Sequence, residues 1–280
     1  MKKKIDFLGV GFSKCASTWI HDILSSHPDI AMPTKRKEVG WFKKEYDNKS
    51  FDWYLNYFDK KDLDNSKIIG EFNPHYSKLE EINLKRINKH LQSKKKFIFI
   101  FRNPWERLKS SFLFSIQSKN HNMTFKERIN LNKFKKGMYS PRVKEWLEEF
   151  QEDQYLFLVF ENIVKNKEKL LQDLADFLNV DVEKFNEEIL SKKSNPTYKP
   201  RFHFIYSFFR KIARKLRDYS FDSFVNLTRK TRIEKIFETN KKPEMKYNKD
   251  DFPKLIKYFK KDTKRLEELT NKNITDIWSF

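Results

Sequence analysis

Residues 7–28 read FLGVGFSKCASTWIHDILSSHP, and this stretch predicts a buried strand, a short loop and a helix in that order. Gly9 and Gly11 give the backbone at the end of the strand a conformational freedom that other residues lack. Ser17 opens the helix, and Pro28 ends it because proline disfavours helical geometry in the residue before it. A strand that leads through such a loop into a helix is the basic unit of an α/β fold.

Three further apolar runs have the length and composition of buried strands, and helical patterns separate them. Strands that alternate with helices favour a mainly parallel sheet with helices packed on it. The expected strands are residues 5–10, 67–71, 96–101 and 155–160. The expected helices are residues 18–25, 82–91, 104–118, 139–150, 167–178 and 262–269.

The chain of 280 residues is strongly basic, with 59 Lys and Arg against 39 Asp and Glu and a formal net charge of +20. Such a field attracts anionic partners, among them nucleic acids, acidic glycans, anionic lipids and phosphorylated cofactors. Cys15 is the single cysteine, which excludes an internal disulfide and disfavours a cysteine metal cluster. We expect a cytoplasmic protein, because no apolar run has the length of a membrane span and no secretory signal is visible.

The loop after the first strand has the features of a phosphate-binding site. The N–H groups and the dipole at the start of a helix attract an anion, and Lys14 adds a positive charge beside them. The loop is not a Walker A sequence, because Ser13 stands where that motif has a glycine before the lysine. The alternative is an ordinary connection in which Lys14 is solvated and Ser17 only caps the helix.

A second candidate site lies in residues 95–112, KKFIFIFRNPWERLKSSF, where Arg102 follows a buried strand. Ligands of open α/β sheets bind at the carboxyl ends of the strands. Pro104 starts a helix, and Ser110 lies about two turns into it. A guanidinium can bind a phosphate through two hydrogen bonds, and a serine hydroxyl can add another. The alternative is an arginine that ends a strand and a serine on a helix surface.

Together the two sites resemble the sulfotransferases that use 3′-phosphoadenosine-5′-phosphosulfate (PAPS), in particular the glycosaminoglycan-type enzymes and their bacterial relatives. In that family a K-x-G-S/T-S/T loop binds the 5′-phosphosulfate and an R-D/N-P-x5-S segment binds the 3′-phosphate. The resemblance covers about residues 5–180, with Ala16 in place of the usual glycine. The matching residues are Lys14, Cys15, Ala16, Ser17 and Thr18 in the first motif and Arg102, Asn103, Pro104 and Ser110 in the second.

The resemblance implies a P-loop-like, three-layer α/β fold in a single domain over residues 1–280. Residues 5–180 would form the nucleotide-binding core, and the basic, helical part 192–280 would complete the cofactor and acceptor sites. Lys241 and Lys242 stand where relatives have a basic loop that closes over the nucleotide. Aromatic and basic residues alternate in 202–216, which we interpret as a helix packed on the core, with a membrane-surface helix as the alternative.

The same resemblance implies sulfuryl transfer from PAPS to a hydroxyl, with PAP as the desulfated product and no metal. Such a reaction depends mainly on positioning and electrostatics. Residues 38–42, EVGWF, resemble the E-x-x-F/W-F stretch that carries the catalytic carboxylate in the glycan enzymes. We therefore expect Glu38 as general base, Lys14 as the cation that stabilises the departing nucleotide, and Trp41 and His75 in contact with the substrate.

Alternative interpretations remain for the general base and for the acceptor. Glu38 follows the basic residues 35–37 and would serve, in the other interpretation, as their solvated partner. His75 is the second candidate base, because a neutral imidazole suits proton abstraction near pH 7. Gly40 and Phe72 stand where many relatives have His and Lys, so the acceptor of those relatives does not carry over. We expect a hydroxyl on a saccharide, with a lipid, a small alcohol or a peptide tyrosine as the alternatives.

Two other functions compete with this one. A nucleotide-dependent kinase would share the phosphate-binding loop, but it would need a glycine before Lys14 and a Mg²⁺-binding acid after a strand. A non-enzymatic protein would bind nucleic acid or an anionic membrane through its basic surface. No nucleic-acid-binding motif is visible, so we expect no nucleic-acid partner. An acidic glycan acceptor together with PAPS would account for the positive charge.

Overall fold

The computed structural model describes residues 4–119, 124–130, 138–151, 154–191, 199–200, 238–239 and 247–279. Its central sheet has five parallel strands in the order β2-β3-β1-β4-β5. These strands are β1 Ile5–Gly9, β2 Ile30–Ala31, β3 Ile68–Phe72, β4 Leu91–Phe101 and β5 Gln154–Val159. A separate antiparallel pair consists of β6 Lys199–Pro200 and β7 Glu238–Thr239.

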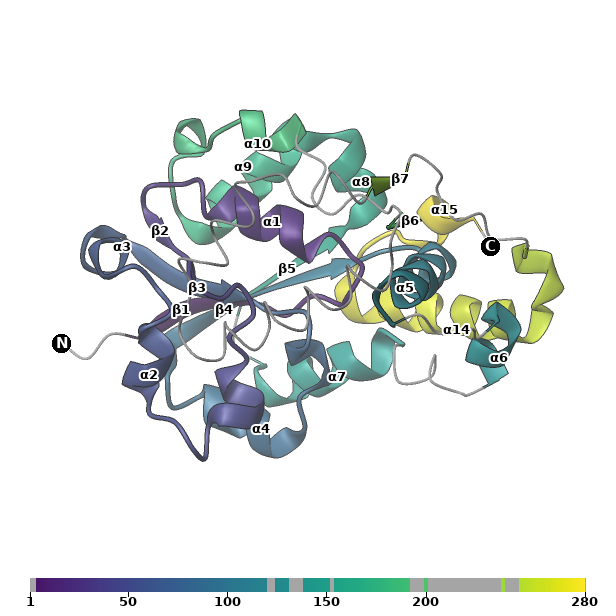
Figure 1. Cartoon of the computed structure of the whole chain (residues 1–280), viewed down its shortest axis with the longest axis horizontal. Helices are drawn as coiled ribbons and strands as arrows, with labels where there is room; N and C mark the ends of the chain where they lie inside the picture. Colours follow the sequence, from purple (N-terminus) through teal and green to yellow (C-terminus); the bar gives the residue numbers. More distant parts are fainter. Residues whose placement is uncertain are drawn as a thin grey trace.

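Helices surround the sheet. They are α1 Ser17–Leu24, α2 Phe51–Leu55, α3 Lys60–Asn65, α4 Glu81–Ile87, α5 Pro104–Lys119, α6 Phe125–Asn130, α7 Ser140–Glu149, α8 Phe160–Lys165, α9 Lys167–Leu178, α10 Glu188–Ser191, α14 Pro253–Thr270 and α15 Thr275–Trp278. In Figure 1, α1, α9 and α10 lie on one face of the sheet, and α4 and α7 lie on the other. α5, α14 and α15 lie beyond the carboxyl ends of β4 and β5, which is the edge where the candidate site is expected.

The predicted α/β fold with a mainly parallel sheet is confirmed. All four predicted strands are present, and β2 adds a short fifth. The helix predicted at 82–91 ends at Ile87, because Leu91 already pairs with Ile5 in the sheet. The helix predicted at 262–269 is part of the longer α14, and segment 202–216 lies outside the described residues. No helix in the described part of the chain combines the length and the apolar character that spanning a bilayer requires.

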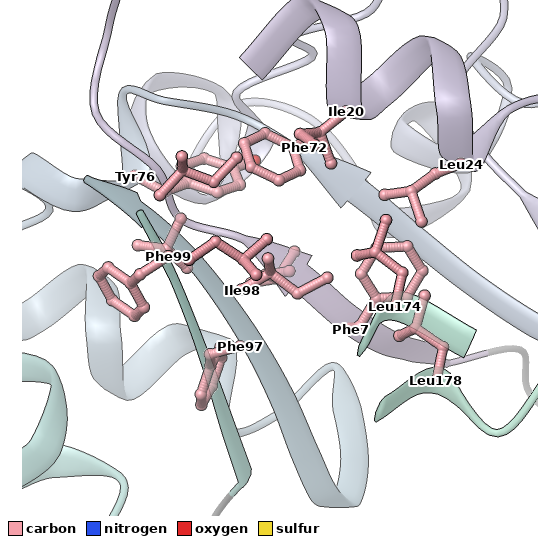
Figure 2. Close-up of a cluster of buried hydrophobic side chains, with 14 of the residues drawn as sticks. Phe7, Ile20, Leu24, Phe72, Tyr76, Phe97, Ile98, Phe99, Leu174 and Leu178 are labelled. Atoms are coloured by element: carbon pink, nitrogen blue, oxygen red, sulfur yellow. The ribbon is translucent and has the colours of Figure 1, made fainter. Parts of the chain in front are cut away.

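The core lies between the sheet and its two helical layers. Phe97 and Phe99 of β4 point to the same face and pack against Trp146 of α7, with ring centroids 5.0 and 5.7 Å apart. On the opposite face, Figure 2 shows Leu24 of α1 and the α9 residues Leu174 and Leu178 beside Phe7 of β1. Buried apolar side chains on both faces explain why the strands read as continuous apolar runs.

β1 and β3 approach each other through reciprocal pairs of glycine and phenylalanine. In their register, Phe7 is opposite Gly70 and Phe72 is opposite Gly9. A Cβ atom on Gly70 would lie 2.2 Å from Cε1 of Phe7, and one on Gly9 would lie 2.0 Å from Cδ2 of Phe72. Each ring occupies the space that a side chain on the facing strand would need. The structure therefore gives Gly9 a packing role in addition to the backbone freedom expected from the sequence.

We predict that Gly70→Ala lowers the free energy of unfolding by about 1–3 kcal/mol, because the added methyl group overlaps the ring of Phe7 in a packed core. Urea denaturation followed by circular dichroism measures this change. Gly11→Ala is the matched control, since its Cβ would lie 3.1 Å from the nearest ring atom of Phe72 and would need a much smaller shift. Equal losses in the two variants would contradict the packing role of Gly70.

Candidate functional site

The loop between β1 and α1 supplies no side-chain cap to the helix. Lys14 and Ala16 both have left-handed backbone geometry, with φ of 73° and 66°. Ala16 occupies the N-cap position of α1, and no side chain caps the helix. The N–H groups of the first turn of a helix have no partner within the helix, and the start of a helix is a common place for an anion to bind. The loop thus has the backbone arrangement of a phosphate cradle.

Arg102, which follows β4, links this loop to the neighbouring strand. Its Nη1 donates a hydrogen bond to the carbonyl oxygen of Lys14 at 3.1 Å, and its guanidinium lies 4.6 Å from the ring centroid of Phe160. The Nε atom of Arg102 is buried and has no hydrogen-bond partner. A buried N–H without an acceptor is costly, and a bound anion would satisfy it.

Lys14 lies in the same basic environment. Its Nζ is 4.3 Å from the ring centroid of Phe114 on α5. Burial lowers the pKa of Lys14, and the positive charge of Arg102 lowers it further. Two cations that disfavour each other in this way are stabilised when an anion binds between them. Ser110 lies half-buried on α5, and Ser17 and Thr18 form the start of α1.

Tyr139, at the start of α7, contacts the residue that follows β4. Its hydroxyl donates to the carbonyl oxygen of Arg102 at 2.7 Å, accepts from the Arg102 N–H at 3.3 Å, and lies 3.7 Å from Sγ of Cys15. The N–H groups of Tyr139 and Ser140 donate to the carboxylate of Asp262 on α14, at 2.8 and 2.9 Å. Through these contacts the C-terminal helix α14 supports both Arg102 and the loop that contains Cys15.

Asn103 provides a second connection to the C-terminal part of the chain. Its Oδ1 accepts from the N–H of Trp105 at 3.0 Å and so caps α5, while its Nδ2 donates to the carbonyl oxygen of Trp278 at 3.0 Å. Glu161 accepts from the Asn103 N–H at 2.9 Å and from Nε1 of Trp278 at 2.8 Å. The corner that carries Arg102 is therefore fixed from α8 and α15 as well.

A second cluster contains the two candidate bases. Nε2 of His75 lies 3.5 Å from Oε2 of Glu38, and both side chains reach solvent, with 56% and 37% of their surface exposed. They line an open pocket of about 310 Å³. The remaining lining residues are Arg36, Val39, Gly40, Lys43, Glu45, Asn73 and Tyr76. His75 follows β3, and the loop of Lys14 follows β1, its neighbour in the sheet, so both clusters lie along one edge.

Lys37 shares the loop of Glu38 but is not among the residues that line the pocket. Its Nζ is buried and has no hydrogen-bond partner. Burial lowers the pKa of Lys37 to about 8, while the charges of Asp22 and Glu38 oppose that shift. The same ammonium contributes to a low pKa of His21, about 3, after the larger effect of burial. Glu38 therefore has a basic neighbour on its own loop that is not bonded to it.

The structure gives the predicted residues different surroundings. The loop residues from Lys14 to Thr18 lie together with Arg102, and Glu38 lies with His75. Trp41 is in the core instead of the pocket wall: it is buried, its ring packs on Tyr54, and its Nε1 donates to the carbonyl oxygen of Lys49 at 2.9 Å. Lys241 and Lys242 lie outside the described residues.

Three residues at these sites were not identified from the sequence: Glu71, Tyr139 and Asp262. The sequence held a signal for Glu71, because it is a carboxylate at the end of the apolar run KIIGE. In the structure its side chain is fully buried. Such a charge needs partners in the fold. Tyr139 and Asp262 carried none, since they are 123 residues apart and their contact exists only in the folded chain.

Comparisons with known proteins identify a family for most of the chain. Residues 4–201 match the family model described as the sulfotransferase domain. The membrane-associated sulfotransferase kil1 of Dictyostelium discoideum is 34% identical over 113 residues, which are 40% of this chain and 23% of that protein. The chain thus spans less than a quarter of this curated relative.

Two solved structures are similar to the chain to different degrees. A sulfotransferase from Alicyclobacillus acidocaldarius superposes with a TM-score of 0.57 at 22% identity, over 69% of this chain and 87% of the other. The sulfotransferase domain from the curacin biosynthetic pathway gives a TM-score of 0.48 at 14% identity, over 70% and 80%. The first of these supports the fold.

We predict that Ala16→Gly raises the free energy of unfolding by about 0.5–1 kcal/mol, because glycine removes the strain of a left-handed alanine and this gain exceeds its greater freedom in the unfolded chain. Thermal and urea denaturation measure the change. The control is Ala175→Gly in the helix α9, where the same substitution should destabilise by about 1 kcal/mol or more. A loss of stability in both variants would show that the loop does not hold Ala16 in this geometry.

Proposed function

The chain belongs to the sulfotransferase domain family, and from this premise we propose that it transfers a sulfuryl group from PAPS to an acceptor hydroxyl. The observation that carries the proposal is Arg102, whose guanidinium keeps a buried Nε without a partner while Nη1 binds the phosphate loop. A phosphate group is an acceptor of the right charge and shape for that donor.

The residues around Arg102 fit a nucleotide that carries anionic groups at both ends. Residues 14–18 would hold the 5′-phosphosulfate through the open N-terminus of α1 and the ammonium of Lys14. Arg102 and Ser110 would hold the 3′-phosphate. PAPS supplies an activated sulfuryl group with PAP as its leaving group. The protein's part is to bind, to orient and to stabilise the negative charge that develops on the leaving oxygen.

Glu38 is the proposed general base. It is on a loop at the carboxyl edge of the sheet, and its carboxylate is partly exposed to a pocket that can admit an acceptor. As the acceptor oxygen bonds to sulfur and the bond to the leaving oxygen breaks, the hydroxyl proton goes to Oε1 or Oε2 of Glu38. His75 orients that carboxylate from 3.5 Å and is the alternative acceptor of the proton.

A saccharide hydroxyl is the proposed acceptor. The pocket beside Glu38 is lined mainly by polar and charged side chains, which suits a ligand with many hydroxyl groups. Arg36 and Lys43 add positive charge at the same place, so an acidic sugar would be favoured over a neutral one. The net charge of +20 would attract an acidic glycan over a longer range.

We further propose that residues 5–180 and the part from residue 192 onward act as one domain in the cytoplasm. Contacts of Asp262 with Tyr139 and of Trp278 with Asn103 support one unit, because they join α14 and α15 to the corner that carries Arg102. The buried thiol of Cys15, the single cysteine, is compatible with a reducing compartment.

We predict that Glu38→Gln reduces sulfuryl transfer by about 100-fold or more while PAP affinity changes less than about threefold, because a neutral amide cannot accept the proton. The assay uses ³⁵S-labelled PAPS with a panel of hyaluronan, dextran, p-nitrophenol and a fatty alcohol. Isothermal calorimetry with PAP measures nucleotide binding. Glu45→Gln is the matched control, since it removes a carboxylate from the same pocket without touching the proposed base.

The panel also separates the acceptor classes. Transfer to hyaluronan above transfer to dextran is the result expected for an acidic saccharide acceptor. Wild-type protein that binds PAP and transfers no label to any member would overturn the saccharide proposal. Equal losses in Glu38→Gln and Glu45→Gln would mean that the pocket tolerates neither change and that Glu38 is not the base.

A further inference from the structure

Glu71 at the end of β3 is a buried carboxylate with an unusually full set of hydrogen bonds. Its side chain is inaccessible to solvent, yet five donors reach its two oxygens. Oε1 accepts from the N–H groups of Val39 and Gly40 at 2.8 and 3.2 Å and from Nδ2 of Asn73 at 3.1 Å. Oε2 accepts from the hydroxyls of Tyr54 at 3.1 Å and Tyr76 at 2.7 Å.

We propose that Glu71 is the positioning residue that holds Glu38 and His75 in contact at the acceptor pocket. The inference rests on the proposed function, because it concerns the residues assigned to proton transfer. The geometry behind it is independent of that function. Glu38 and His75 belong to two separate loops, and both loops are bonded to this one carboxylate.

The first connection fixes the loop of Glu38. The two N–H groups that follow Glu38 in the chain both donate to Oε1 of Glu71. The second of them belongs to Gly40, whose φ of 74° is a left-handed geometry that glycine adopts without strain. The buried carboxylate of Glu71 holds this turn through both hydrogen bonds. The side chain of Glu38 then lines the pocket.

The second connection fixes the loop of His75. Asn73 donates from Nδ2 to Oε1 of Glu71 and accepts from the N–H of His75 at its Oδ1, at 3.0 Å. One amide side chain thus transmits the position of Glu71 to the backbone of His75. Because Val39, Gly40 and Asn73 all bond to the same oxygen, a shift of Glu71 would displace both candidate bases together.

The remaining contacts explain why a carboxylate can be buried here. Burial raises the pKa of Glu71, and the hydrogen bonds from Tyr76, Gly40, Asn73 and Tyr54 act in the opposite direction. Hydrogen bonds to an ionised acceptor are about twice as strong as those between neutral groups. The three donors on Oε1 are N–H groups that cannot accept, whereas the two tyrosine hydroxyls can reverse their role. The N–H groups around Oε1 therefore require an acceptor at that position. The tyrosine hydroxyls around Oε2 can contact either an acceptor or a donor.

This asymmetry defines a disruptive variant and a conservative one. Glu71→Met is similar in size and removes every acceptor, so we expect kcat to fall by about 100-fold with PAP affinity unchanged within threefold. Glu71→Gln can turn its oxygen to the N–H groups and its NH₂ to the tyrosines, so it should keep kcat within about fivefold of wild type. Asn73→Leu removes the link from Glu71 to His75 and leaves the N–H groups of Val39 and Gly40 on Glu71, so a fall in kcat at unchanged PAP affinity is expected should Glu71→Met fail to fold.

A double-mutant comparison separates positioning from general stability. If Glu71 acts through Glu38, Glu71→Met in a Glu38→Gln background should change the remaining turnover by less than about twofold. The matched control is Glu267→Met. Glu267 also accepts two successive N–H groups and a hydroxyl, from Ile274 and Thr275, but does so on the C-terminal helices. Its loss should reduce turnover by the same factor in both backgrounds.

Amide hydrogen exchange provides a readout that needs no activity. In Glu71→Gln the N–H groups of Val39 and Gly40 should stay protected, and in Glu71→Met they should exchange at least tenfold faster. The N–H of Val10, which donates to Ile98 in the sheet, serves as the internal control. Unchanged exchange of Val39 and Gly40 in Glu71→Met, or full additivity with Glu38→Gln, would overturn the proposal. Failure of the proposed function would instead be seen as absent PAP binding by the wild type, with the exchange result unaffected.

Discussion

The hydrogen bond from Arg102 to the carbonyl oxygen of Lys14 joins the ends of two adjacent parallel strands, and the candidate nucleotide site depends on it. It fixes the loop of Lys14 against β4 and gathers two positive charges at one place. Bringing these charges together costs free energy. Burial lowers the pKa of Lys14, and the charge of Arg102 lowers it further. A half-buried guanidinium whose Nε is buried and unpartnered, beside a helix without a side-chain cap, is stable only because the surrounding fold holds it. An anion would relieve both costs.

The surrounding support has two separate parts. Tyr139, Asn103 and Asp262 connect the candidate nucleotide site to α7, α8, α14 and α15, so the C-terminal helices act on Arg102. Glu71 connects the loops of the pocket that Glu38 and His75 line to the end of β3. The two supports share no hydrogen bond among those described here. Changes in one are therefore expected to affect nucleotide affinity, and changes in the other to affect turnover.

The sequence predicted those features that depend on local pattern. Apolar runs and helical spacing located the four long strands, and their carboxyl ends located Lys14 and Arg102 on one edge, because parallel strands share that edge. Contacts between distant segments had no such signal: the pairing of Glu38 with His75 and the bonds of Asp262 to Tyr139 arise only when the loops and helices pack. Trp41 was misleading, since an aromatic residue beside a candidate base has the same sequence signature in a pocket wall and in a core. Its burial depends on α2, whose five residues are too short for a reliable periodic pattern.

The claim that this edge of the sheet binds PAPS is tested most directly by calorimetric titration of the wild type and Arg102→Ala with PAP. Arg142→Ala is the control, because Arg142 forms a surface pair with Glu145 on α7. We expect wild type and Arg142→Ala to bind PAP alike, and Arg102→Ala to bind it on the order of 100-fold more weakly because charged hydrogen bonds are lost. A folded wild type that does not bind PAP, or an Arg102→Ala variant that binds it as the wild type does, would contradict PAPS binding at this edge of the sheet.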